Sequence, residues 1–198
     1  MARIIGITGG IASGKSTVTG SLRQQGYQVI DADQVVHELQ EPGERLYQAL
    51  LSAFGPAILQ ENGRLDRLKL GAMIFGNPQL LEQSSQIQNQ IIREELAGRR
   101  DLLAEKEDIF FMDLPLLFEL GYETWFDQVW LVDVTEETQL SRLMARNDLS
   151  QEEAEKRIAA QLSLQEKRNR ADVLIDNNGP LELTQEQLRE ALQKLERR

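Results

Sequence analysis

The sequence lacks cysteine altogether and has one histidine, His37, among its 198 residues. The absence of cysteine excludes a disulfide framework, a thiolate zinc site, an iron–sulfur cluster and a cysteine nucleophile. One histidine cannot build a histidine-rich metal site, and a Ser-His-Asp hydrolase would depend on His37 alone. No apolar run approaches the ~18 residues of a membrane-spanning helix, and the start of the chain has no signal-peptide pattern. We therefore expect a cytoplasmic protein that has no membrane partner.

Positive charge is in the minority, because 22 Lys and Arg residues stand against 32 Asp and Glu residues and give a formal net charge of −10. Contacts with nucleic-acid phosphates need clustered Lys and Arg, so we expect no nucleic-acid partner. The hydrophobic share of 41% and the charged share of 27% are typical of a globular protein. We find no feature that indicates an obligate protein partner.

Five short apolar runs, each ending at a polar residue or a glycine, predict β-strands. The runs are apolar throughout rather than alternating, which is typical of a parallel sheet with both faces covered by helices. Helical patterns separate the runs, so the sequence predicts an α/β fold with a five-stranded parallel sheet. The predicted strands are Arg3–Thr8, Gln28–Asp31, Ile109–Asp113, Val129–Asp133 and Val173–Asp176.

Two connections between these strands are longer than a crossover helix needs. Residues 34–108 show leucines at helical spacing and breaks at Gly55-Pro56 and Asn62-Gly63, and they predict a mainly helical insertion. Residues 134–172 break at Asn147-Asp148 and predict a helix–turn–helix flap. We divide the chain into a core of residues 1–33, 109–141 and 171–198, a helical insertion of residues 34–108 and a lid of residues 142–170.

Several helix starts have recognisable caps. Ser150 with Glu153, and Thr184 with Gln187, fit the capping box, in which each side chain bonds to the backbone of the other residue. Thr135 precedes two glutamates that suit the first turn of a helix.

A glycine-rich segment directly follows the first predicted strand and precedes a predicted helix, residues 16–25. Its letters, GGIASGKST, match G-x-x-x-x-G-K-[ST], a loop whose backbone N–H groups hold nucleotide phosphates. Lys15 would reach the β- and γ-phosphates, and the Ser16 hydroxyl would ligate Mg²⁺. The alternative is a glycine-rich turn that carries Lys and Ser by chance. The predicted nucleotide-binding residues here are Ile11, Ala12, Ser13, Gly14, Lys15, Ser16 and Thr17.

A second phosphate-site element should be an apolar strand that ends in a carboxylate near the metal. The run 109–113 ends in Asp113, which we predict to orient the metal or Ser16, although three other predicted strands also end in Asp.

A GTPase switch would need Asn-Lys-x-Asp after a late strand, and the chain has no such run. A small-molecule kinase remains, with the two insertions as acceptor platform and lid.

Phosphoryl transfer to a hydroxyl needs a base that takes the hydroxyl proton. The second predicted strand leads into two carboxylates, Asp31 and Asp33. Ligands of open α/β sheets bind at this edge, and Asp33 could accept the proton of an attacking hydroxyl. Alternatively, Asp33 caps a helix over residues 34–40. In the flap, Arg142 and Arg146 share a helix face and could clamp phosphates, or they could form a solvated basic face.

Together these residues resemble the dephospho-coenzyme A kinase family. The similarity runs through ITGGIASGKST, VIDAD, LDR at 65–67, DLPLLFE at 113–119, the two flap arginines, Gln161, Lys167 and ADVLIDNNG at 171–179. The resemblance implies a nucleotide-binding core, a helical CoA-binding domain and a lid. It implies ATP-dependent phosphorylation of the ribose 3′-hydroxyl of dephospho-CoA, with ATP and dephospho-CoA as small-molecule substrates and Mg²⁺ as cofactor.

Site roles also follow from the resemblance. The aspartate matching Asp33 is the base, the arginines matching Arg142 and Arg146 approach the ATP phosphates, and Asn177 would lie near adenine. One position departs from the family, whose members commonly carry His-Pro where this chain has Asn89-Gln90. Asn89 can keep a hydrogen bond to the acceptor but cannot titrate. The rival interpretations are a nucleoside, nucleotide or shikimate-type kinase, and a nucleotide-dependent regulatory binding protein.

Overall fold

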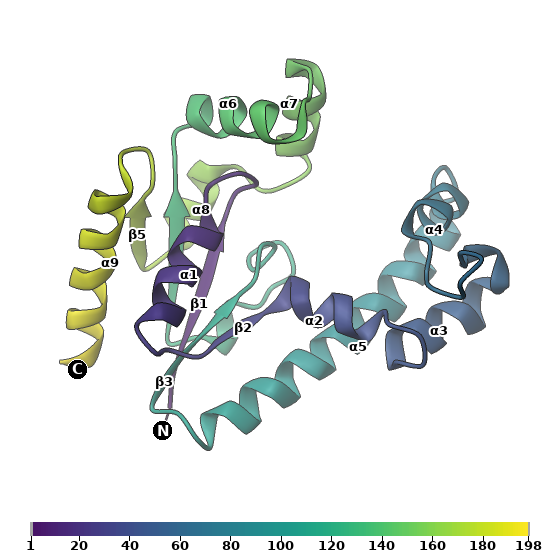
Figure 1. Cartoon of the computed structure of the whole chain (residues 1–198), viewed down its shortest axis with the longest axis horizontal. Coiled ribbons are helices and arrows are strands. Elements are labelled where there is room, and N and C mark those ends of the chain that lie inside the picture. The colour runs from purple at the N-terminus through teal and green to yellow at the C-terminus, as the bar shows by residue number, and fades with distance from the viewer. Residues whose placement is uncertain (1, 198) are drawn as a thin grey trace. The chain divides into compact units, whose positions relative to one another are not determined.

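The computed structural model of the chain describes residues 2–197 (Figure 1). The chain forms two compact units, one of Met1–Ile30 with Leu103–Arg198 and one of Asp31–Leu102. Within the described residues, the apolar stretches of the helices are too short to cross a bilayer.

A five-stranded parallel sheet is the centre of the fold, as the sequence predicts. Its strand order is β2-β3-β1-β4-β5. Ile7 of β1 lies opposite Asp113 of β3, and Gly9 of β1 lies opposite Val132 of β4, so the carboxyl ends of these three strands meet at one edge. The strands are β1 (Arg3–Gly9), β2 (Val29–Asp31), β3 (Ile109–Asp113), β4 (Gln128–Asp133) and β5 (Val173–Asp176).

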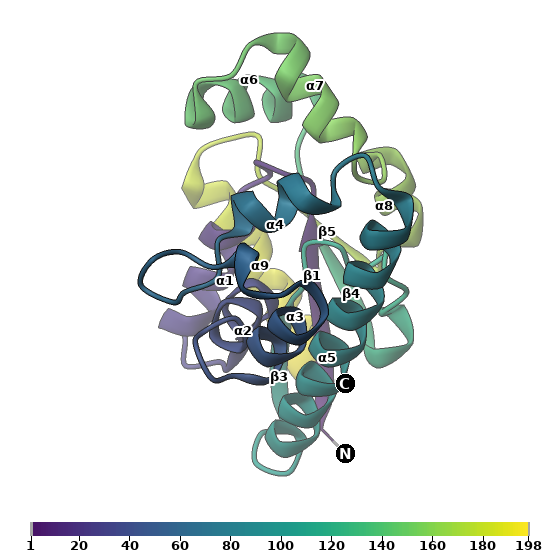
Figure 2. The same ribbon diagram turned by 90° about the vertical axis from the view of Figure 1, so that its right-hand side faces the viewer.

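Helices α1 (Lys15–Gln24) and α9 (Leu181–Glu196) pack side by side against the sheet (Figures 1 and 2). The core between them includes Val18, Leu22 and Leu188 from the helices and Ile7 and Trp130 from the sheet, all at most 1% exposed. Gly6 and Thr8, which alternate with Ile5 and Ile7 along β1, are also buried. The prediction that both faces of the sheet are covered is therefore confirmed.

The other face of β1 contains Gly6, and a Cβ there would lie 2.7 Å from Leu117 and 2.8 Å from Phe126. These two side chains belong to the segment after β3, which includes the short 3₁₀ helix η2 (Glu123–Trp125). A residue larger than glycine at this point would push that segment off the sheet.

The helical insertion contains the predicted helices, and its last one extends further than the leucine pattern indicates. Leu46, Leu50 and Ile58 are fully buried in this unit. The break at Gly55-Pro56 is present, because Gly55 ends α3 and Pro56 starts a 3₁₀ turn. The elements are α2 (Ala32–Leu39), α3 (Arg45–Phe54), η1 (Pro56–Ile58), α4 (Arg67–Ile74) and α5 (Pro78–Ala104).

The flap contains three helices rather than the predicted two: α6 (Glu136–Asn147), α7 (Gln151–Ala159) and α8 (Leu164–Arg170). The break after Asn147 is confirmed, with Asp148 in a left-handed conformation. The capping box at Ser150 is confirmed. A second capping box, Ser163 with Glu166, starts α8 and was not predicted.

The predicted capping box at Thr184 is wrong. Helix α9 begins at Leu181, directly after Pro180, so Thr184 lies inside the helix and is 2% exposed. Its hydroxyl donates to the Asp176 carbonyl at 3.2 Å and lies 3.0 Å from Asn177 Oδ1. The hydroxyl therefore fastens the loop after β5 instead of capping a helix.

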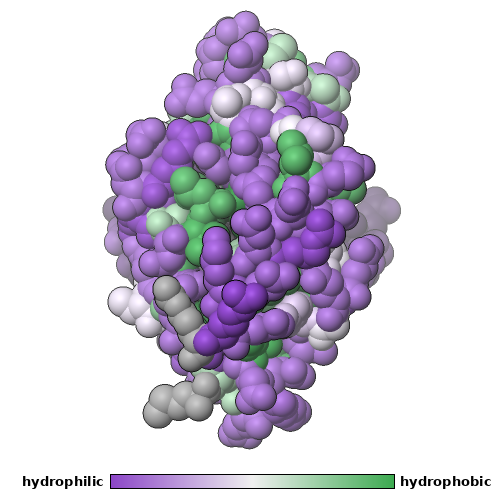
Figure 3. Space-filling model, turned by 90° about the vertical axis from the view of Figure 1, so that its left-hand side faces the viewer, coloured by the Kyte–Doolittle hydropathy of each residue, from purple (hydrophilic) through white to green (hydrophobic). Residues whose placement is uncertain are grey.

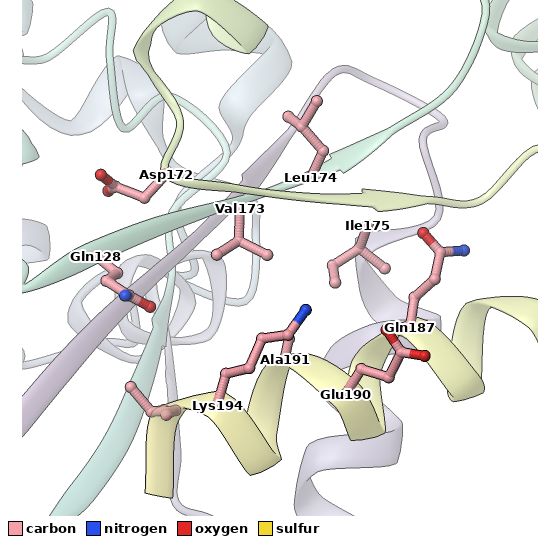
Figure 4. A pocket seen from close by; sticks show the side chains of 10 residues that line it. Gln128, Asp172, Val173, Leu174, Ile175, Gln187, Glu190, Ala191 and Lys194 are labelled. Atoms are coloured by element: carbon pink, nitrogen blue, oxygen red, sulfur yellow. The ribbon is translucent and has the colours of Figure 1, made fainter. Parts of the chain in front are cut away.

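The edge strand β5 is paired at its end by a side chain. Gln187 of α9 accepts the Asp176 N–H at 2.9 Å and donates to the Asp176 carbonyl at 3.0 Å. Figure 4 shows Gln187 reaching from α9 to the end of the strand, while Val173 and Ile175 point toward the helix. The outer face of the molecule on this side is mostly hydrophilic, with small separate apolar areas (Figure 3).

Candidate active site

The phosphate loop turns sharply between β1 and α1. Ser13 N–H donates to the Gly10 carbonyl, and Thr17 N–H donates to the Gly14 carbonyl, each at 3.0 Å. Ala12 and Gly14 have positive φ angles of 61° and 88°. Within residues 2–197, the N–H groups of Ala12 and Gly14 have no protein acceptor, although N–H groups must be satisfied when they are buried. The loop thus offers donors for an anion.

Helix α1 begins at Lys15, one residue earlier than predicted, so its N-terminus also faces this loop. Ser16 and Thr17 are exposed in its first turn. Lys15 Nζ lies 3.4 Å from Asp113 Oδ1, and these side chains are 17% and 9% exposed. The loop lysine and the aspartate that ends β3, singled out separately in the sequence, are therefore brought together.

The Asp113 carboxylate and the Ser16 hydroxyl are hard oxygen donors, the type that Mg²⁺ prefers. The described residues contain no group of three or more His, Cys, Asp or Glu side chains placed to hold a metal. This donor set fits Mg²⁺, which usually takes one or two protein ligands together with substrate phosphates.

A second ion pair lies at the end of β4. Arg168 Nε donates to Asp133 Oδ2 at 2.7 Å, and Arg168 Nη2 donates to the Val134 carbonyl at 2.9 Å. The hydrogen bond that Arg168 donates to Asp133 raises the pKa of the Arg168 guanidinium above its ordinary value. This pair ties α8 to the sheet edge that carries the phosphate loop.

The two flap arginines lie on α6, where Arg142 is half-buried and Arg146 is exposed. Arg146 Nε donates to Asn147 Oδ1 at 2.9 Å. The structure gives neither guanidinium a bond to the loop, so their contact with phosphates stays a prediction.

Asn177 is brought to the loop. Its side chain donates to the Ser13 carbonyl at 2.8 Å, its Oδ1 lies 3.0 Å from the Thr184 hydroxyl, and the residue is 7% exposed. Because both polar atoms of this side chain have partners in the protein, the amide supports the phosphate loop. Its proximity to adenine stays a prediction.

The structure separates the two roles considered for Asp33. Helix α2 begins at Ala32, and the side chain of Asp31 accepts the Gln34 N–H at 3.1 Å as its cap. Asp33 therefore lies in the first turn, exposed, and does not cap the helix. It belongs to the unit Asp31–Leu102.

Two glutamines that contact the loop carry no signal in a motif search. Gln139 Nε2 donates to the Ile11 carbonyl at 3.0 Å, and Gln161 Oε1 accepts the Ile11 N–H at 2.9 Å. Gln161 is indicated only by the resemblance to the kinase family. Gln139 was missed, although it lies four residues before the buried Leu143 and so occupies the buried stripe of α6.

A buried lysine also borders the site. Lys167 of α8 has no exposed surface, and its Nζ lies 2.8 Å from Glu119 Oε1 and 3.4 Å from the Pro115 carbonyl. Glu119 Oε1 also accepts the Leu162 N–H at 3.0 Å. These contacts fix the segment that directly follows Asp113.

The chain was compared with known proteins. The sequence profile of the dephospho-CoA kinase family matches residues 3–182. A dephospho-CoA kinase from Streptococcus pyogenes is 60% identical over 192 residues, which cover 97% of this chain and 98% of that protein. Among solved structures, TT1252 from Thermus thermophilus superposes with a TM-score of 0.82 at 36% identity, with 98% of each chain covered. Dephospho-CoA kinase from Campylobacter jejuni superposes with a TM-score of 0.76 at 27% identity, with 98% of each chain covered.

The profile match extends from the phosphate loop past the loop that carries Asn177, and the relatives are covered almost completely. The chain belongs to the dephospho-CoA kinase family.

Proposed function

We propose that this kinase transfers the γ-phosphoryl group of ATP to the ribose 3′-hydroxyl of dephospho-CoA, giving coenzyme A and ADP in the final step of coenzyme A biosynthesis. The observation that carries the proposal is the phosphate loop with unpaired N–H groups beside Lys15 and Asp113, in a chain of this family. In phosphoryl transfer the protein contributes mainly positioning and electrostatic stabilisation.

Residues Ile11–Thr17 form the nucleotide-binding segment. The loop amides and the N-terminus of α1 stabilise negative charge on the phosphates, and Lys15 adds a full positive charge at the β- and γ-phosphates. Asp113 holds the lysine ammonium before the nucleotide arrives, because the two groups are 3.4 Å apart. The loop is thus prepared for the phosphates, which lowers the cost of ordering it on binding.

Ser16 and Asp113 would hold Mg²⁺. When bound, the ion neutralises charge on the β- and γ-phosphate oxygens. Asp113 then supports both the metal and Lys15.

Asp33 accepts the proton of the attacking 3′-hydroxyl. Because Asp31 caps α2, the Asp33 carboxylate is exposed and available for an acceptor. The helical insertion serves as the acceptor platform. Asn89 and Gln90 occupy the place of the His-Pro pair common in the family, and the exposed Asn89 side chain can donate a hydrogen bond there.

Residues 142–170 act as the lid. Arg142 and Arg146 lie one helical turn apart, so both guanidinium groups can approach the transferring phosphoryl group and stabilise its charge. Asn177 completes the nucleotide site next to the loop. A cytoplasmic location is also part of this proposal.

The decisive experiment compares Asp33→Asn with Asp31→Asn in a coupled ADP-release assay with dephospho-CoA. Asp33→Asn should lower kcat by at least about 100-fold, the usual contribution of a general base, while the affinity for ATP stays unchanged. Asp31→Asn makes the same chemical change two residues earlier, and Asn is as good a helix cap as Asp. This control should keep kcat within a few-fold of wild type.

Two results would contradict the proposal. Turnover with a nucleoside monophosphate or shikimate but not with dephospho-CoA would indicate another small-molecule kinase, and ATP binding without any acceptor turnover would indicate a regulatory protein. Near-normal turnover of Asp33→Asn would remove this residue from the mechanism.

A further inference from the structure

Three side-chain amides from distant parts of the chain bind the backbone of the phosphate loop. Gln139 of α6 holds the Ile11 carbonyl, Gln161 before α8 holds the Ile11 N–H, and Asn177 after β5 holds the Ser13 carbonyl. All three distances lie between 2.8 and 3.0 Å. Gln139 and Asn177 are 3% and 7% exposed, so solvent competes little for these bonds.

Peptide geometry converts these contacts into a direction for the next N–H group. A trans peptide unit is planar, so the carbonyl of one residue and the N–H of the next point in opposite directions. When Gln139 holds the Ile11 carbonyl, it turns the Ala12 N–H the other way. When Asn177 holds the Ser13 carbonyl, it turns the Gly14 N–H the other way. Neither of these two N–H groups has an acceptor among the described residues of the protein.

The preceding peptide unit is held on both sides. Its N–H, from Ile11, donates to Gln161, and its carbonyl, from Gly10, accepts the Ser13 N–H at 3.0 Å. A loop held at this peptide cannot rotate freely about Ile11. The positive φ angles of Ala12 and Gly14 complete a backbone arrangement in which successive N–H groups form a concave anion site.

Two glycines of the loop lie where the side-chain amides of Gln139 and Asn177 approach its backbone most closely. A Cβ at Gly10 would lie 2.4 Å from Gln139 Nε2, and a Cβ at Gly14 would lie 2.2 Å from Asn177 Nδ2. Each amide thus occupies space that a side chain on the loop would take. The close approach gives these two glycines a second role besides the freedom of the backbone.

We propose that Gln139 and Asn177 are positioning residues that aim the Ala12 and Gly14 N–H groups at the nucleotide phosphates, with Gln161 fixing the peptide before them. The inference rests on the proposed phosphate binding by this loop. It makes the phosphate affinity of the loop depend on residues that never touch the nucleotide phosphates. The proposal also adds two flap residues, Gln139 on α6 and Gln161 before α8, to the groups that determine nucleotide binding.

The test uses Gln139→Met, which keeps the length of the side chain but removes the N–H donor, and Asn177→Leu as a second, independent variant. Binding of ADP and of adenosine is measured by competition against a fluorescent nucleotide, with thermal unfolding as the check on folding. We expect each variant to bind ADP about tenfold more weakly. Adenosine, which has no phosphates, should bind to Gln139→Met as it does to wild type, and the KM of Gln139→Met for dephospho-CoA should not change. Gln25→Met, which removes an exposed amide at the C-terminal end of α1 that bonds to the Ser21 carbonyl, is the matched control and should bind ADP normally.

Equal ADP affinity of wild type and folded Gln139→Met would overturn the inference. A parallel loss of adenosine and ADP affinity would also overturn it, because that pattern indicates contact with the base or a general loss of structure. If Gln139→Met does not fold, Asn177→Leu decides by its ADP affinity, and wild-type affinity of that folded variant would overturn the inference. If neither variant folds, the pairs act as packing contacts and the inference fails. Failure of the wild-type chain to bind ADP would instead refute the proposed function.

Discussion

Lys167 is a charged residue without any exposed surface, which is rare unless the charge is paired. Its ammonium has Glu119 as its charged partner and the Pro115 carbonyl as a further acceptor. Taking both charges out of water costs free energy, and the pair is stable only while both partners are present. The pair joins α8 of the flap to the segment after β3. It therefore fixes the position of α8 relative to the segment that begins after Asp113.

We predict that Lys167→Met lowers the free energy of unfolding by about 3 to 5 kcal/mol, because it leaves the Glu119 carboxylate largely buried and uncompensated. The double variant Lys167→Met/Glu119→Gln removes that charge and should recover a substantial part of the loss. Urea denaturation followed by circular dichroism measures both. If the double variant is as unstable as the single variant, the cost comes from packing and not from the uncompensated charge.

The residues of the candidate site differ in how far the sequence could predict them. Lys15 and Asp113 stand in a motif and at a strand end, and a parallel sheet brings those two places to one edge, so their proximity could be predicted. Gln139 could not, because its role depends on where α6 crosses the loop and not on its neighbours in sequence. Which residue caps α2 could not be predicted either, since Asp31 and Asp33 are both good caps and only the start of the helix decides between them.

At the scale of elements, α7 and α8 start with the same capping box but have different attachments. Helix α7 packs on α6 within the flap, whereas α8 packs on β4 and carries Lys167 and Arg168, which pair with Glu119 and Asp133. Fraying of α8 would therefore loosen two ion pairs of the core. Fraying of α7 would remain inside the flap.

Ser163→Ala and Ser150→Ala are matched variants that compare the effect of fraying α8 with the effect of fraying α7. Each removes the hydroxyl of a capping box, a loss of about 1 kcal/mol for the helix. We predict that Ser163→Ala lowers the midpoint of global thermal unfolding by several degrees, while Ser150→Ala leaves it nearly unchanged and speeds amide hydrogen exchange within α7. Calorimetry and hydrogen exchange check the two effects, and equal shifts in the midpoint would contradict this view of α8.

The strands of the sheet could be predicted to within one residue, because each is a short continuous apolar run that ends at a polar residue or a glycine. Helix boundaries were less predictable where tertiary contacts override a local motif. Thr184 and Gln187 have the spacing of a capping box, yet Pro180 starts α9 one turn earlier and both side chains bond to the loop after β5. The third flap helix was missed because α8 has seven residues, too few for a clear periodicity.

At the scale of the whole molecule, the link between Tyr27 and the C-terminal end of α9 predicts how stability depends on pH. The Tyr27 hydroxyl donates to Glu196 at 2.6 Å. Burial, together with the hydrogen bond and the negative charge of Glu196, raises the pKa of Tyr27 to about 12, against about 10 in an unfolded chain. The folded state therefore favours the protonated phenol. The resulting stability is fully present below pH 10 and is lost as the pH rises to 12.

We predict that wild type loses about 1 kcal/mol more stability than Tyr27→Phe between pH 9 and pH 12, a figure reduced for the solvent near this hydroxyl. Urea denaturation of both proteins at several pH values measures the difference. Parallel pH profiles for the two proteins would show that the tyrosine does not couple to unfolding.

The sheet ends at β5, where the amide of Gln187 takes the place of a sixth strand at Asp176. A side-chain amide carries the same donor and acceptor as a peptide group, so the last exposed pair of the strand is already satisfied. An extended segment from another molecule could not extend the ladder there without first displacing Gln187. One glutamine therefore works against edge-to-edge aggregation, a protection that needs neither a charge nor a proline on the strand itself.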